Sequence, residues 1–102
     1  MDKETLTALK GSIRKWERIV NRTGVDEGSE NCPLCHIYLL TKCQGCPVGK
    51  HCIDTVWGKW VLHHAVVHHK PRRSIVGKCR TCKKLAREEL EFLQSLLPKD
   101  AR

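Results

Sequence analysis

Seven cysteines constrain what this 102-residue chain can fold into more than any other feature. Six of them form three Cys-x-x-Cys pairs, Cys32–Cys35, Cys43–Cys46 and Cys79–Cys82, and Cys52 stands alone. Two cysteines at this spacing can lie at the ends of a tight turn with both sulfurs directed at one ion. Gly45 gives the middle pair the conformational freedom that such a turn needs. The sequence therefore predicts metal binding, with zinc as the expected metal.

The number of ligands predicts one or two zinc ions. A structural zinc site takes four ligands, so seven cysteines fill one site and leave three for a second site that would also need a histidine. The first pair could join the last pair, with the remaining cysteines and a histidine in the other site. A sequential arrangement is also open, because spacing alone does not decide between them. The predicted cysteine ligands are Cys32, Cys35, Cys43, Cys46, Cys52, Cys79 and Cys82.

Three other uses of the cysteines are weaker. Disulfides are disfavoured because the cysteine count is odd and the polar start Met1-Asp2-Lys3-Glu4 does not resemble a signal peptide. Three copies of a redox motif in one small chain would be unusual. An iron–sulfur cluster stays an alternative, because Cys46 is followed by Pro47, as in cluster-binding loops. We expect an intracellular, cytoplasmic protein without a membrane span.

The expected fold is mainly α: one small metal-stapled domain, residues 1–102, with about three helices and cysteine-rich zinc-knuckle loops. The chain has only five aromatic residues, so metal binding should supply much of the folding energy. The expected segments are an N-terminal helix in 1–24, cysteine-rich loops in 32–52, a central helix in 54–70, and the last Cys pair with a C-terminal helix in 79–98.

Apolar residues at three- and four-residue steps place these helices. The first helix, about 4–22, has a stripe formed by Leu6, Leu9, Ile13, Trp16 and Val20. The central helix has one formed by Val56, Trp57, Trp60, Val61, His64 and Val67. The last helix has a wide stripe of leucines, with Glu88, Glu89 and Glu91 expected on its polar side. So wide a stripe could also seat a second copy of the chain. One or two helical turns are expected after Cys35.

The central helix carries four histidines, at positions 63, 64, 68 and 69. His64 and His68 are one helical turn apart and could hold one metal ion. For any single histidine, ordinary partial burial is the commoner explanation. By contrast, Asp26, Glu27 and Glu30 are spaced irregularly in a loop and predict no paired acid–base chemistry.

Charge is distributed unevenly along this basic chain, whose formal net charge is +8. Between Thr55 and Arg87 there are nine basic residues and no acidic one. Such a cluster favours contact with phosphate groups, so the expected partner is nucleic acid or an acidic host protein. The predicted contact residues are Lys70, Arg72, Arg73, Lys78, Arg80, Lys83, Lys84 and Arg87.

Several of these motifs together resemble a group of small cysteine-rich proteins of phages and bacteria. The resemblance covers most of the chain and rests on Ile13–Val20, Asn31–Cys35, Tyr38, Cys43–Val48, Cys52, Thr55, Trp60 and His63. The chain departs from the group at Val56-Trp57, where Pro-Tyr is usual. The resemblance implies His63 as the eighth metal ligand and a phage or bacterial setting, and it implies no particular activity.

The expected function is a non-enzymatic, zinc-stabilised module that binds nucleic acid or a host protein that handles nucleic acid. One alternative is a metal-dependent nuclease of the His-Asn-His type, since histidines lie between Cys pairs. The only asparagines, Asn21 and Asn31, precede that histidine region, and a nuclease needs an open metal position with a general base. The other alternative is the iron–sulfur protein.

Overall fold

The computed structural model describes residues 1–38, 44–49, 54–69 and 74–99. These residues form four α-helices and one 3-10 helix, which confirms the mainly α fold. The α-helices are α1 (Lys3–Val20), α2 (Pro33–Tyr38), α3 (Val56–Val66) and α4 (Arg80–Ser95), and the 3-10 helix is η1 (Gly28–Asn31). In the described part of the chain, the β pairing is one isolated bridge between Asp26 and Ser74.

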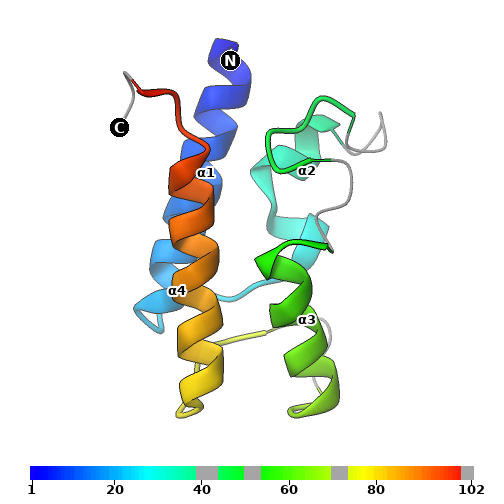
Figure 1. The fold of residues 1–102 in the computed structure, drawn as a ribbon, viewed down its shortest axis with the longest axis vertical. Coiled ribbons are helices and arrows are strands. Elements are labelled where there is room, and N and C mark those ends of the chain that lie inside the picture. The colour runs from blue at the N-terminus through cyan, green and yellow to red at the C-terminus, as the bar shows by residue number, and fades with distance from the viewer. Residues whose placement is uncertain (39–43, 50–53, 70–73, 100–102) are drawn as a thin grey trace.

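The two long helices, α1 and α4, lie side by side, and α2 and α3 form a second column beside them (Figure 1). The columns meet at two places, because α4 contacts α3 and α1 contacts α2. None of the described helices combines the length and the hydropathy needed to cross a bilayer.

The core lies between these helices and contains twelve buried hydrophobic residues among those described. Leu9, Ile19, Leu34 and Trp60 are fully buried, and the Trp16 ring meets the Trp60 ring edge-on, with centroids 5.1 Å apart. Gly11 fits tightly inside α1 because a Cβ there would lie 3.2 Å from Pro33 Cγ, so its place is explained by the approach of α2. Gly45 has a φ of 89°, as expected for the turn before Cys46.

The ends of α1 and α3 differ from the predicted limits. The Asp2 side chain accepts a hydrogen bond from the Thr5 backbone N–H at 2.7 Å and caps α1 as expected. The prediction that the central helix continues to residue 70 is wrong. α3 ends at Val66, and His69 takes a left-handed backbone conformation, with a φ of 54°. His68 therefore lies just beyond the helix, although its backbone N–H still donates to the His64 carbonyl oxygen at 3.2 Å.

Two side chains do not lie where helical periodicity predicted. Val67, expected on the apolar face, is 55% exposed at the end of α3. Glu89, expected on the polar side of α4, is buried. It follows Cys82 by seven residues, or about two turns, and so lies in line with the buried face of the helix.

Candidate metal centre

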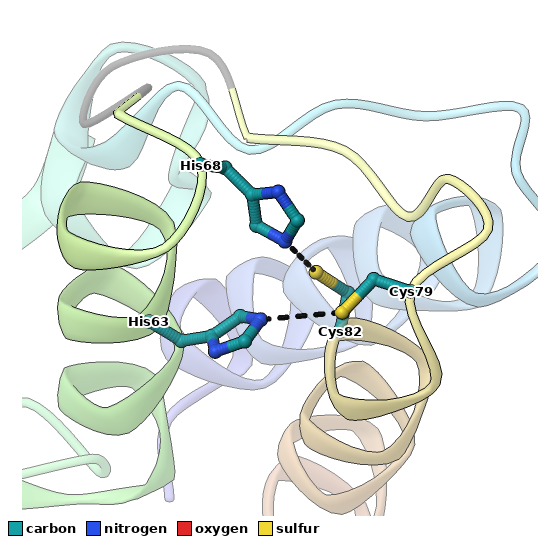
Figure 2. Close-up of side chains that lie close together, drawn as sticks. All are labelled: His63, His68, Cys79 and Cys82. Carbon is teal, nitrogen blue, oxygen red and sulfur yellow. Dashed lines mark hydrogen bonds between the residues drawn. The ribbon is translucent and has the colours of Figure 1, made fainter.

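Four side chains from α3, α4 and the residues beside them converge on one point. They are His63 and His68 from one column, and Cys79 and Cys82 from the other (Figure 2). Their ligand atoms all lie within 4.8 Å of one another. His63 Nε2 lies 3.4 Å from Cys79 Sγ, and His68 Nε2 lies 3.2 Å from Cys82 Sγ. We call this group the His2Cys2 site.

The distances in the His2Cys2 site fit a single tetrahedral ion. With zinc–sulfur bonds of about 2.3 Å and zinc–nitrogen bonds of about 2.0–2.1 Å, a nitrogen and a sulfur on one tetrahedron lie about 3.5 Å apart. The two nitrogen–sulfur distances, 3.4 and 3.2 Å, are close to that length. These two distances match a tetrahedral zinc site, and the four ligand atoms all lie within 4.8 Å of one another.

Local structure explains how each ligand reaches the centre. Cys79 is the N-cap residue of α4 and Cys82 lies in its first turn, so the Cys-x-x-Cys spacing turns both sulfurs to one side. His63 lies in the last turn of α3. His68 follows the end of that helix. In a continuous helix, residues five apart would point about 140° away from each other. In the structure both rings nevertheless reach the cysteines, His63 beside Cys79 and His68 beside Cys82.

The protonation of the ligands makes metal binding depend on pH. Burial lowers the pKa of His63, and the neighbouring His68 and His64 lower it further, which favours the neutral ring that can bind a metal. Burial raises the pKa of the Cys82 thiol to about 12, and the adjacent Cys79 adds to this. The backbone N–H of Cys82 lowers the pKa of Cys79. An ion must displace thiol protons, so metal affinity should rise with pH.

His64 lies against the centre and is occupied elsewhere. Its Nδ1 is 2.9 Å from the Trp60 carbonyl oxygen and its Nε2 is 3.0 Å from the Ile75 carbonyl oxygen. The same Nε2 is 3.4 Å from Cys82 Sγ. The buried ring thus joins α3 to the segment that leads to Cys79. It supports the ligands from outside rather than completing the His2Cys2 site, and such outer contacts tune metal affinity.

Asp26 fixes the position of α3, which carries half of the site. Its Oδ1 accepts hydrogen bonds from Lys15 Nζ at 2.8 Å and from the Gly28 N–H at 3.0 Å. Its Oδ2 accepts from the indole N–H groups of Trp57 and Trp60, both at 3.0 Å. The backbone of Asp26 also pairs with Ser74, before Cys79. Sequence reasoning missed this role, because nothing in the loop distinguishes Asp26 from the two glutamates near it.

The other predicted cysteine ligands lie apart from the His2Cys2 site. Cys32, Cys35 and Cys46 line a cavity between α1, α2 and α4. The proposed four-cysteine site made of the first and last pairs is not formed, because the last pair meets two histidines instead. Cys43 and Cys52 lie outside the described residues.

Cys32 has the surroundings of a thiolate. The Cys35 backbone N–H donates to Cys32 Sγ at 3.2 Å. A hydrogen bond from the Cys35 side chain lowers the pKa of Cys32 to about 6, against the opposing effect of burial. A sulfur held in this way is suited to metal ligation, because hydrogen bonds to the charged form favour the thiolate.

Of the predicted contact residues, Lys78, Arg80, Lys83, Lys84 and Arg87 are exposed at and beyond the start of α4. Lys70, Arg72 and Arg73 lie outside the described residues.

Comparison of the chain with protein-family models, curated proteins and solved structures finds no match. The resemblance to small phage and bacterial proteins therefore stays a prediction, and function has to be argued from the site.

Proposed function

We propose that this chain is a non-enzymatic binding module whose fold is stabilised by a zinc ion on His63, His68, Cys79 and Cys82. The observation that carries the proposal is a group of four protein ligand atoms within 4.8 Å of one another, with two nitrogen–sulfur distances close to the tetrahedral value. Two nitrogen and two sulfur ligands around one point suit zinc. The ion would link α3 to α4. Because the hydrophobic core is small, this link would contribute a large share of the free energy of folding.

The ligand set disfavours the two alternative functions. A hydrolytic metal centre keeps one position open for water or substrate, whereas this centre has four protein ligands for one ion. In an iron–sulfur cluster the protein ligands are spread over two or more iron atoms. Four ligand atoms within 4.8 Å of one another fit a single ion better.

A second zinc ion belongs to the same proposal. The His2Cys2 site uses two of the seven cysteines and leaves five: Cys32, Cys35, Cys43, Cys46 and Cys52. Four of these would fill a second structural site in the sequential arrangement. The thiolate-like surroundings of Cys32 support this assignment.

The proposed partner is nucleic acid, bound in the cytoplasm of a bacterial cell by the exposed cations near the start of α4. The first turn of α4 contains no acidic residue. Cations are unfavourable at a helix N-terminus, where the helix dipole is positive, so this cluster weakens the helix end rather than stabilising it. A divalent ion on two thiolates and two neutral histidines adds no net charge. The site therefore does not cancel the cations, and a polyanion would.

An acidic host protein is the second candidate partner, since it would use the same cations. A second copy of the chain is not part of the proposal. Leu85, Ala86 and Leu93, from the wide stripe expected on the last helix, are buried in the core.

Lys83→Ala combined with Arg87→Ala is expected to weaken binding to DNA or RNA about equally across sequences. The two residues lie one turn apart on α4 and both are exposed. If each contacts one phosphate of duplex DNA, the slope of log affinity against log salt should become shallower by about 1.8. Fluorescence anisotropy over a salt series measures this slope.

The matched control is Lys10→Ala with Arg14→Ala, an exposed pair at the same spacing on α1. It removes the same charge and should leave most of the affinity in place. Equal losses in both double variants would show that only net charge matters. A salt-independent affinity would contradict the phosphate proposal altogether and leave the acidic protein as partner.

A further inference from the structure

A cavity of about 260 Å³ lies between α1, α2 and α4. Aromatic rings of Trp16, Tyr38 and Trp57 line it. An apolar cavity of about 150 Å³ can hold benzene, so this one has room for roughly ten non-hydrogen atoms. Its size therefore suits a small organic molecule.

Two buried polar groups of this cavity lack partners among the described residues. They are Oε2 of Glu89 and Oγ of Ser12, from residues only 3% and 4% exposed. Both residues line the cavity, one from α4 and one from α1. Buried polar atoms without a hydrogen bond are uncommon and reduce the stability of a protein, so these two atoms indicate a missing hydrogen-bond partner.

The contrast with Asp26 shows what Glu89 lacks. The Asp26 carboxylate is also buried, but each of its oxygens accepts two hydrogen bonds. One of these four bonds comes from the Lys15 ammonium group. Lys15 lines the same cavity, yet its ammonium group is directed at Asp26. Of the ion pairs formed by described residues, none includes Glu89. A cationic group with N–H donors would supply what is missing.

We propose that this cavity binds a small organic cation, an aryl or alkyl amine or amidine whose N–H groups donate to Glu89 and Ser12. The aromatic walls would contact the body of the ligand and attract its positive charge. Burial raises the pKa of Glu89 to about 7, so its carboxylate would attract a cation and repel an anionic ligand most strongly above neutral pH. The proposal uses neither the His2Cys2 site nor the cations of α4. Cys32, Cys35 and Cys46 also line this cavity, so the ligand would lie beside the proposed second zinc site.

Benzamidine and benzamide test this proposal, because they have the same shape and nearly the same size and differ in charge. Each would be titrated into the metal-loaded protein and followed by calorimetry and by the indole N–H signals of Trp16 and Trp57. We expect benzamidine to bind at least about tenfold more tightly than benzamide. Glu89→Gln keeps the shape of the side chain and should remove this preference.

The matched control is Glu91→Gln, which neutralises an exposed carboxylate on the same helix and should keep the preference. The metal content of both variants should equal that of the parent protein, which separates this test from that of the zinc site. Equal affinity for both compounds, or no saturable binding up to about 10 mM, would overturn the proposal.

One further measurement needs no variant and stands even if Glu89→Gln fails to fold. Nuclear Overhauser contacts should join the ring protons of bound benzamidine to Leu93 and Trp57. These residues line the cavity from two different helices, α4 and α3. Contacts confined to residues outside the cavity would likewise contradict the proposal.

Discussion

His68→Asn is expected to lower zinc affinity by more than about 100-fold and to bring the melting temperature close to that of the metal-free protein. The change removes one of four ligands from the His2Cys2 site. Loss of a mere outer-shell partner already costs about 10- to 100-fold in metal affinity, so loss of a ligand should cost more. Competition with a chromophoric chelator measures the affinity, and thermal unfolding followed by circular dichroism measures the stability.

His69→Asn is the matched control for this change. His69 is exposed and lies outside the ligand group. Its φ of 54° is one that asparagine tolerates well. Its effect on the free energy of unfolding should therefore stay within about 0.5 kcal/mol. If the two variants bind zinc alike, His68 is not a ligand and the assignment of the site is wrong.

Asp26→Asn is expected to reduce the free energy of unfolding by about 3–5 kcal/mol, the usual cost of breaking a buried ion pair by removing one partner. Lys15 would keep a buried charge, since its side chain is only 12% exposed. The new amide nitrogen would also face N–H donors that now meet a carboxylate oxygen. The whole free energy of unfolding of a small domain is only about 5–15 kcal/mol, so urea unfolding should show a large loss of stability.

Asp54→Asn provides the comparison, because it makes the same chemical change at an exposed position just before α3. Its effect should stay within about 0.5 kcal/mol. If Asp26→Asn is as mild as that, the hydrogen bonds around Asp26 do not hold α3 in place, and another contact must position His63.

Much of this fold follows from local patterns that are visible in the sequence. Helical periodicity predicts α1 and α4 because each has one apolar stripe, and the stripe explains how they pack. The two residues between Cys79 and Cys82 suffice to predict that both sulfurs can face one ion. The resemblance to the phage and bacterial group predicts His63 as a metal ligand, and in the structure His63 lies beside Cys79.

The remaining features depend on contacts that no local pattern records. His68 joins the site from just beyond the end of α3, whereas sequence periodicity favoured a helix up to Pro71. Asp26 becomes central because two indole groups and an ammonium group, 11 to 34 residues away, converge on it. Glu89 looks like a surface residue beside Glu88 and Glu91, and its burial follows from the way α4 packs against α1.

Removal of the metal tests most directly whether an ion holds this fold together. The protein would be treated with a strong chelator under reducing conditions, and elemental analysis would verify the loss of zinc. We expect the helical circular dichroism to fall and the melting temperature to drop by about 20 °C or more, with recovery when zinc is returned. Unchanged helicity and unchanged melting in the verified metal-free protein would contradict the account.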